Sequence, residues 1–295
     1  TIDASREITT EYTIPNTLNS LILSRIDGLE KDLKLLLQKA TIIGEDFFIK
    51  ILSLLEKKLG FNDDITKPVH DLESENFIHH YLKELDHYRF KHILTRDVAY
   101  STMLKSNKKI LHNAVADVIE DNFQDIIEKF YYDLAVHYDS CDNYKKAVLY
   151  LKKAGDKYND IVDKKSALKC FSRCVELITK YKLDDSDTLY QCKTNCADIY
   201  CHIGDTERSL NIVQSLLKKK PPAKHMARLR YINGLTLYTI RESSNALEQF
   251  KLSSTLYLKL KNPSMIADIN VRIGLTYIDT GKYDKAMIHF KKSIE

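Results

Sequence analysis

Small and apolar residues in the C-terminal half of the chain recur with helical spacing, and the whole pattern recurs 40 residues later. The first copy contains Gly234, Tyr238, Ala246 and Phe250, and the second contains Gly274, Ile278, Ala286 and Phe290. Ala286 and Phe290 are four residues apart, so they share one helix face and can fill the gap beside a neighbouring helix. A glycine at the first position lets that neighbour approach closely. Because one such helix pair cannot bury its apolar face alone, the pattern predicts stacked helix pairs.

Weaker copies of the pattern precede these two. They contain Ala135, Tyr138, Ala147 and Leu151, then Gly155, Ala167 and Phe171, and then Ala197, Tyr200, Gly204 and Ser209. Ala135 and Gly155 are only 20 residues apart, which is too close for two complete helix pairs. We therefore expect the helix over residues 145–161 to be shared by two successive units.

This pattern resembles the tetratricopeptide repeat (TPR) over about residues 128–295. The positions where that repeat usually has tryptophan are occupied by Lys193, Tyr231 and Asn270, so the version is divergent. The residues expected in the repeat core are Ala135, Ala147, Ala197, Gly234, Ala246, Phe250, Gly274, Ala286 and Phe290. We expect a TPR-like α-solenoid over residues 126–295, truncated at its C-terminus because the chain stops inside a second helix.

The first 125 residues do not repeat. An extended lead-in over residues 8–14 precedes helices predicted from apolar residues at helical spacing, the third of which contains Phe47, Ile51 and Leu55. A fourth helix over residues 67–76 is followed by two predicted strands, 77–82 and 87–90, joined by a polar turn. The predicted fold is therefore mainly α: an N-terminal winged-helix-like helical domain with a short β-hairpin over residues 1–125, followed by the α-solenoid.

Three segments carry a second resemblance. They are IPNTLNSLILSRIDGLEKDLKLLLQKATIIGEDF (Ile14–Phe47), YRFKHILTRDVAYSTMLKSNKKILHNAVADVIE (Tyr88–Glu120) and DLAVHYDSCDNYKKAVLYLKKAGDKY (Asp133–Tyr158). In order and spacing they resemble the winged helix and first repeats of signal-transduction ATPases of the STAND type. Such modules occur in soluble-type class III adenylyl cyclases, in maltose-activator-like transcription regulators and in large protein kinases.

The resemblance implies a non-catalytic regulatory and interaction fragment of a cytoplasmic STAND-type ATPase, with fusion to a class III adenylate/guanylate cyclase as the first reading. The alternative is the same architecture in a transcription regulator or protein kinase, with repeats that sense a small-molecule effector. The chain has no G-x-x-x-x-G-K-[ST] loop and no H-E-x-x-H, G-x-S-x-G or kinase motif. We expect no catalytic, cofactor-binding or metal site here, and ATP and Mg²⁺ in a module upstream of Thr1.

Composition adds little to this picture. The 295 residues are 44% hydrophobic and 29% charged, and the formal charge of +4 does not by itself indicate a nucleic-acid or membrane partner. No apolar run reaches the length of a membrane-spanning helix.

The cysteines include two i,i+4 pairs, Cys170/Cys174 and Cys192/Cys196, which favour buried reduced thiols over metal ligation. His112 and His137 match histidines of the resembled family, and we expect them to have a packing or hydrogen-bonding role.

Binding is expected on the repeats. The predicted recognition helix of the winged-helix-like domain carries Asp71, Glu73 and Glu75 against Lys67 alone, which disfavours DNA. The first helix of each repeat lines the concave face, so we expect a protein or peptide there, with contacts to the ATPase module as a second interaction. The candidate residues are Tyr132, Gln191, Thr194, Asp198, Arg228, Tyr231, Tyr238 and Asp268. In the alternative interpretation several first-helix positions, such as Leu235 and Leu275, face the next unit as core, whereas Arg228 and Asp268 are exposed.

Overall fold

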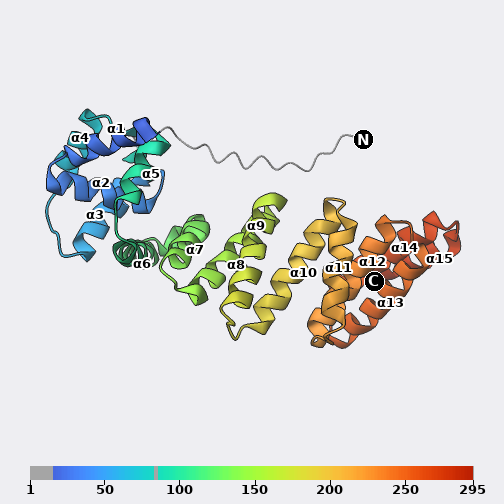
Figure 1. Ribbon diagram of the computed structural model, residues 1–295. Coiled ribbons are helices and arrows are strands. Elements are labelled where there is room, and N and C mark those ends of the chain that lie inside the picture. Colours follow the sequence, from blue (N-terminus) through green and yellow to red (C-terminus); the bar gives the residue numbers. More distant parts are fainter. Residues whose placement is uncertain (1–15, 83–85, 295) are drawn as a thin grey trace. The chain divides into compact units, whose positions relative to one another are not determined.

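The computed structural model describes residues 16–82 and 86–294 and divides into two compact units, Thr1–Asn143 and Tyr144–Glu295 (Figure 1). The division falls after residue 143, whereas the sequence pattern placed the domain boundary at residue 125. The extended lead-in over residues 8–14, and residues 83–85 of the turn, lie outside the described residues.

The first unit is a set of helices with one small sheet. Its elements are α1 (Asn16–Asp27), α2 (Lys31–Ile43), β1 (Asp46–Phe48), α3 (Ile49–Lys58), α4 (Thr66–Ser74), β2 (Ile78–Leu82), β3 (His87–Phe90), α5 (Ile93–Ser101), α6 (Lys105–Asn122), the 3-10 helix η2 (Gln124–Phe130) and α7 (Tyr131–Ser140). The two strands expected from the sequence are present as β2 and β3, which pair antiparallel.

The sheet has a third strand, and this corrects one expectation. The apolar spacing predicts Phe47 in the third helix, but it lies in β1, and the helix begins only at Ile49. β1 pairs antiparallel with β3, with Phe47 opposite Tyr88, so the strand order is β1-β3-β2. Phe47 is fully buried, and its ring lies 6.2 Å from that of Tyr88 and 6.0 Å from that of Phe90. The core contact across the sheet therefore holds Phe47 in extended backbone.

The second unit consists of helices that pack in consecutive pairs (Figure 1, green to red). They are α8 (Tyr144–Asp160), α9 (Lys164–Lys180), α10 (Ser186–His202), α11 (Thr206–Leu217), α12 (Ala223–Thr239), α13 (Ser243–Lys259), α14 (Pro263–Asp279) and α15 (Tyr283–Ile294). This is the solenoid of TPR-like helix pairs that the repeat pattern predicted.

Short polar turns set where these helices begin. The side chains of Asp163, Asp185, Asp205 and Asn262 each accept a hydrogen bond from the backbone N–H three residues later, which caps α9, α10, α11 and α14. Several of the turns between helices contain a residue with positive φ, and Gly204 and Gly281 are two of them. Gly204 and Gly281 take this conformation without the steric cost that a Cβ would impose.

Close glycine–phenylalanine contacts join the helices of three pairs. Gly155 faces Phe171, Gly234 faces Phe250 and Gly274 faces Phe290. Of the expected core residues, Ala135, Ala147, Ala197, Ala246, Ala286 and Phe250 are buried, whereas Phe290 is half-buried. Ala135 lies on α7 and so belongs to the first unit.

Candidate functional site

A groove of about 800 Å³ runs along the second unit. It is lined by Lys152, Asp156, Gln191, Thr194, Asn195, Asp198, Lys224, His225, Arg228, Tyr231, Tyr257, Leu260, Asn262, Met265 and Asp268. Most of these residues come from α8, α10, α12 and α14, which alternate with the helices α9, α11 and α13 along the chain. Every second helix of the solenoid therefore contributes to one continuous surface.

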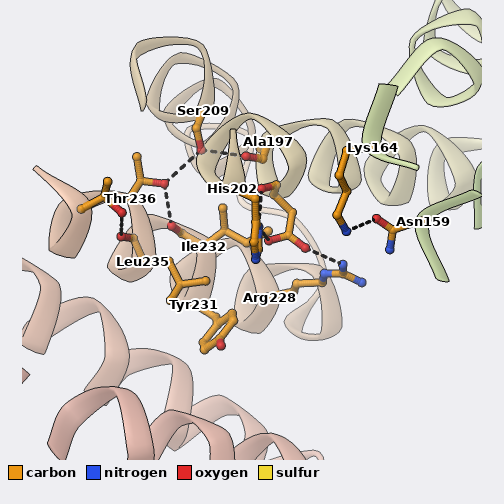
Figure 2. Close-up of polar contacts among 12 residues, drawn as sticks. Asn159, Lys164, Ala197, His202, Ser209, Arg228, Tyr231, Ile232, Leu235 and Thr236 are labelled. Atoms are coloured by element: carbon orange, nitrogen blue, oxygen red, sulfur yellow. Dashed lines mark hydrogen bonds and ion pairs between the residues drawn. The ribbon is translucent and has the colours of Figure 1, made fainter. Parts of the chain in front are cut away.

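Opposite charges meet near the middle of the groove. An Arg228 terminal nitrogen lies 3.3 Å from an Asp198 carboxylate oxygen, and His202 lies next to the same aspartate (Figure 2). Burial would raise the pKa of Asp198, but the hydrogen bond from His202 and the charge of Arg228 outweigh it, so this pKa lies below its usual value. The same hydrogen bond raises the pKa of His202. Arg228 keeps nearly half of its side-chain surface exposed, so its guanidinium retains donors for a bound molecule.

A second polar pair joins α12 and α14. The Tyr231 hydroxyl donates a hydrogen bond to Asp268, and Arg272 Nε lies 3.9 Å from the same carboxylate. Burial, followed by the hydrogen bond to Asp268, raises the pKa of Tyr231, so the phenol stays protonated at neutral pH. Tyr231 thus presents a ring held in a fixed orientation to the groove.

Buried hydroxyl groups hold α10, α11 and α12 together beneath this surface. Ser209 Oγ lies 2.9 Å from the Ala197 carbonyl oxygen and 3.0 Å from Thr236 Oγ1 (Figure 2). Thr236 Oγ1 also donates to the carbonyl of Ile232 at 2.9 Å. Ser209 and Thr236 are fully buried, so these bonds form away from water and fix the helix spacing.

Other groove residues have defined partners. His225 Nε2 lies 2.6 Å from an Asp187 oxygen, and Lys152 pairs with Asp156 at 2.7 Å. Gln191 donates to Asp187 through its amide nitrogen. Asn195 sits between Gln191 and Asp198 along α10, so one helix face combines two amides with a carboxylate.

The structure brings most of the candidate binding residues together. Those that line the groove are Gln191, Thr194, Asp198, Arg228, Tyr231 and Asp268. Thr194 is only 2% exposed and donates its hydroxyl hydrogen to the Tyr190 carbonyl, so it offers little contact surface. Tyr238 does not line the groove and hydrogen-bonds to Asp279. Tyr132 lies on α7, in the first unit.

Several groove residues are absent from the set expected from the sequence. Asn195, Lys224, His225, Tyr257 and Met265 all line it. Asn195 could have been found, because it follows Gln191 by four residues and so lies on the same helix face. Tyr257 lies on a second helix, α13, which the repeat pattern assigned away from the concave face.

The cysteines and histidines singled out in the sequence have packing roles in the described parts of the chain. Cys170, Cys174, Cys192 and Cys196 are buried free thiols. His112 and His137 are buried, and their Nδ1 atoms are 2.8 Å apart. Across residues 16–82 and 86–294, no cluster of three or more His, Cys, Asp or Glu side chains has a metal-binding arrangement. Within the same ranges, no helix combines the length and apolar character needed to cross a bilayer.

Comparison with known families identifies a tetratricopeptide repeat in residues 267–295. No curated protein matches the chain. Among solved structures, BtubC from P. vanneervenii is 14% identical, with a TM-score of 0.49 over 67% of this chain and 83% of that protein. A Rap protein complexed with competence and sporulation factor is 17% identical, with a TM-score of 0.47 over 94% of this chain and 70% of that one.

A third similar structure is a STAND protein with a tetratricopeptide repeat sensor from Pyrococcus horikoshii. It is 13% identical, with a TM-score of 0.39, and the match covers 94% of this chain. This chain spans 46% of the length of that protein.

Proposed function

We propose that the second unit binds a peptide or an exposed segment of a partner protein in the groove lined by α8, α10, α12 and α14. The observation that carries this proposal is the convergence of Asn195, Arg228, Tyr257 and other polar and aromatic side chains from successive helices on one surface. A groove of about 800 Å³ is of the size that holds a short peptide or a comparable ligand.

The chemistry of the lining favours a peptide. Gln191 and Asn195 carry both a donor and an acceptor, which is what a peptide backbone requires. The half-buried Tyr231 supplies flat apolar surface beside them, and Arg228 supplies a partly exposed positive charge. Such amides can hydrogen-bond to both the N–H and the C=O groups of a bound main chain, while aromatic and charged side chains contact its residues.

The proposal extends to the parent protein. The first unit combines helices with a three-stranded antiparallel sheet, an arrangement compatible with a winged helix that relays the state of an ATPase module to the repeats. We propose a regulatory role in a STAND-type ATPase, of which fusion to a class III cyclase is one form and a transcription regulator or kinase another. The reading frame upstream of Thr1 tests this part, because a STAND parent requires a phosphate-binding loop there.

The binding proposal is tested by selecting peptides from a random library on the whole chain and measuring their affinity by titration calorimetry. The double variant Gln191→Ala/Asn195→Ala removes two groove amides from α10. The matched control, Asn211→Ala/Gln214→Ala, removes the same two side-chain types from exposed positions on α11. We expect the groove variant to weaken binding by about tenfold, the effect of one or two lost hydrogen bonds, and the control to leave affinity unchanged. Selected peptides that bind both variants as well as the unmodified chain would contradict the groove assignment.

A further inference from the structure

The first unit has a groove of its own, distinct from the one on the repeats. It has a volume of about 430 Å³ and lies among α2, α3, α4 and the loop between α3 and α4. Its lining residues are Glu30, Asp32, Leu33, Leu35, Leu36, Lys39, Glu56, Phe61, Asp63, Asp64, Ile65, Pro68 and Asp71.

The charge of this lining is one-sided. Its acidic residues are Glu30, Asp32, Glu56, Asp63, Asp64 and Asp71, and its one basic residue is Lys39. Glu30, Asp32, Asp63 and Asp71 are exposed, and no ion pair or hydrogen bond holds their carboxylates among the described residues. These four carboxylates repel one another, and a cation placed among them would relieve that repulsion.

The same groove exposes apolar surface. Leu35 is 39% and Phe61 49% exposed, and Leu33 and Pro68 are partly exposed beside them. Large exposed apolar side chains that are gathered on one concave surface indicate an interaction site, whereas isolated ones need no explanation. An occupant of this groove must therefore combine positive charge with apolar side chains.

A buried carboxylate at the groove has one unsatisfied oxygen. Glu56 is 6% exposed, and its Oε2 lies 2.7 Å from Lys39 Nζ, which itself lies 4.2 Å from the centre of the Phe61 ring. Glu56 Oε1 is buried and has no hydrogen-bond partner. Because Oε1 has almost no accessible surface, the Lys39–Glu56 pair belongs to the wall of the groove, and the exposed carboxylates are the ones a partner can reach.

We propose that this groove binds a basic amphipathic segment of a partner protein, in which Lys or Arg side chains flank a leucine-like residue. The basic side chains pair with Asp32, Asp63 and Asp71, and the apolar residue covers Leu35 and Phe61. Charge complementarity excludes nucleic acid, whose phosphates the four free carboxylates would repel. This inference is independent of the binding proposed for the repeats, since it rests on other residues in the other unit.

The test uses a fluorescent synthetic peptide with Leu at positions i, i+3, i+4 and i+7 and Lys or Arg elsewhere, titrated with the whole chain. The variant Asp32→Asn/Asp71→Asn removes two groove charges that have no partner to lose. The matched control, Glu75→Gln/Asp125→Asn, removes two exposed carboxylates of the same unit that do not line the groove. We expect about tenfold weaker binding for the groove variant and less than about twofold for the control at low ionic strength. At about 1 M salt, where the screening length is about 3 Å, the difference between them should shrink.

A second arm tests the apolar half of the proposal. Leu35→Ser should weaken the peptide several-fold at every salt concentration, because the loss of apolar contact is not screened. Equal weakening by the groove and control variants would overturn the proposal, since it would show a general effect of net charge. Spermine tests whether positive charge alone is enough. If spermine displaces the peptide at an equal concentration of positive charge, and Leu35→Ser binds the peptide as well as the unmodified chain, the proposal is overturned and the groove is a site for small organic cations.

Discussion

Gly234 on α12 lies so close to Phe250 on α13 that a Cβ atom at Gly234 would come within 2.6 Å of the aromatic ring. Phe250 is fully buried, so the ring cannot move aside into solvent. The contact brings the two helices of this pair together, and the ring of the groove residue Tyr231, three residues before Gly234 on α12, lies 6.1 Å from the Phe250 ring. A glycine in the middle of a helix, normally destabilising, is required here by the close approach.

This geometry predicts the sign of a glycine substitution. In an exposed helix, Gly→Ala stabilises by up to about 1 kcal/mol because alanine has the higher helix propensity. Gly234→Ala should instead destabilise, by about 1–2 kcal/mol net, because the methyl group overpacks a closed core. Urea unfolding monitored by circular dichroism measures the difference. A stabilised Gly234→Ala variant would show that α12 and α13 are not as close as described.

Gly274→Ala provides the comparison. Its added Cβ would lie 2.5 Å from the Phe290 ring, which is as close as at Gly234. Phe290 is only half-buried, so its ring can shift outward. We expect a smaller loss than at Gly234, or none, and an equal loss at both sites would contradict this account.

The two phenylalanines should differ in the same direction when they are truncated. Phe250→Ala empties a closed site and should cost about 3–5 kcal/mol, whereas Phe290→Ala should cost less because part of that ring already faces solvent. Chemical unfolding of both variants under identical conditions tests this. Equal losses below about 1 kcal/mol at both positions would mean that the repeat register is wrong.

Most of the repeat architecture could be predicted from the sequence because the information is local. Glycine, alanine and phenylalanine recur at fixed spacings on two helices that are adjacent in the chain, so a single repeat shows which residues meet. Strand β1 could not be found in this way. It is three residues long, too short for alternation to show, and its partner strand lies about 40 residues further on.

The candidate binding surface was only partly predictable, for a related reason. Helical period indicates which residues share a face, but it does not decide whether a face meets the next helix or an open groove. Thr194 was expected to be accessible, yet it is buried with its hydroxyl bonded to the Tyr190 carbonyl. Tyr238 shares α12 with Arg228 but does not line the groove, and its hydroxyl hydrogen-bonds to Asp279 on α14.

The buried histidine pair of the first unit predicts acid sensitivity. His112 Nδ1 lies 2.8 Å from His137 Nδ1, and His112 Nε2 lies 3.0 Å from the Tyr100 hydroxyl. One Nδ1 must donate and the other must accept, so both rings cannot be protonated in the folded state. Burial lowers the pKa of His112 to about 4 and that of His137 to about 3.

The sign of the effect follows from the proton balance. In the unfolded chain both imidazoles have a pKa of about 6.5. Between that pH and about 4 the unfolded state therefore binds more protons than the folded state. The free energy of unfolding therefore has its full value above about pH 6.5. It decreases as the pH falls toward 4, by up to about 1.4 kcal/mol per pH unit for each ring. Urea unfolding at pH 7.5, 6 and 5 measures this slope. The variant His112→Leu/His137→Leu removes both rings and should flatten it, and an unchanged slope would assign the acid sensitivity to other groups.

The binding role proposed for Arg228 can be separated from its effect on stability. Arg228→Glu reverses a partly exposed charge in the groove and places a second carboxylate beside Asp198, which keeps its contact with His202. Because an exposed ion pair contributes only about 0–1 kcal/mol, the stability of the fold should change little. Binding of a peptide selected on the unmodified chain should weaken by more than about 1 kcal/mol, since a charge-assisted contact becomes repulsive.

Arg208→Glu is the matched control. Arg208 also pairs with an aspartate, Asp205 at 3.2 Å, but it lies on α11 and does not line the groove. Calorimetry in which Arg208→Glu loses binding and Arg228→Glu keeps it would move the binding surface to the other set of helices.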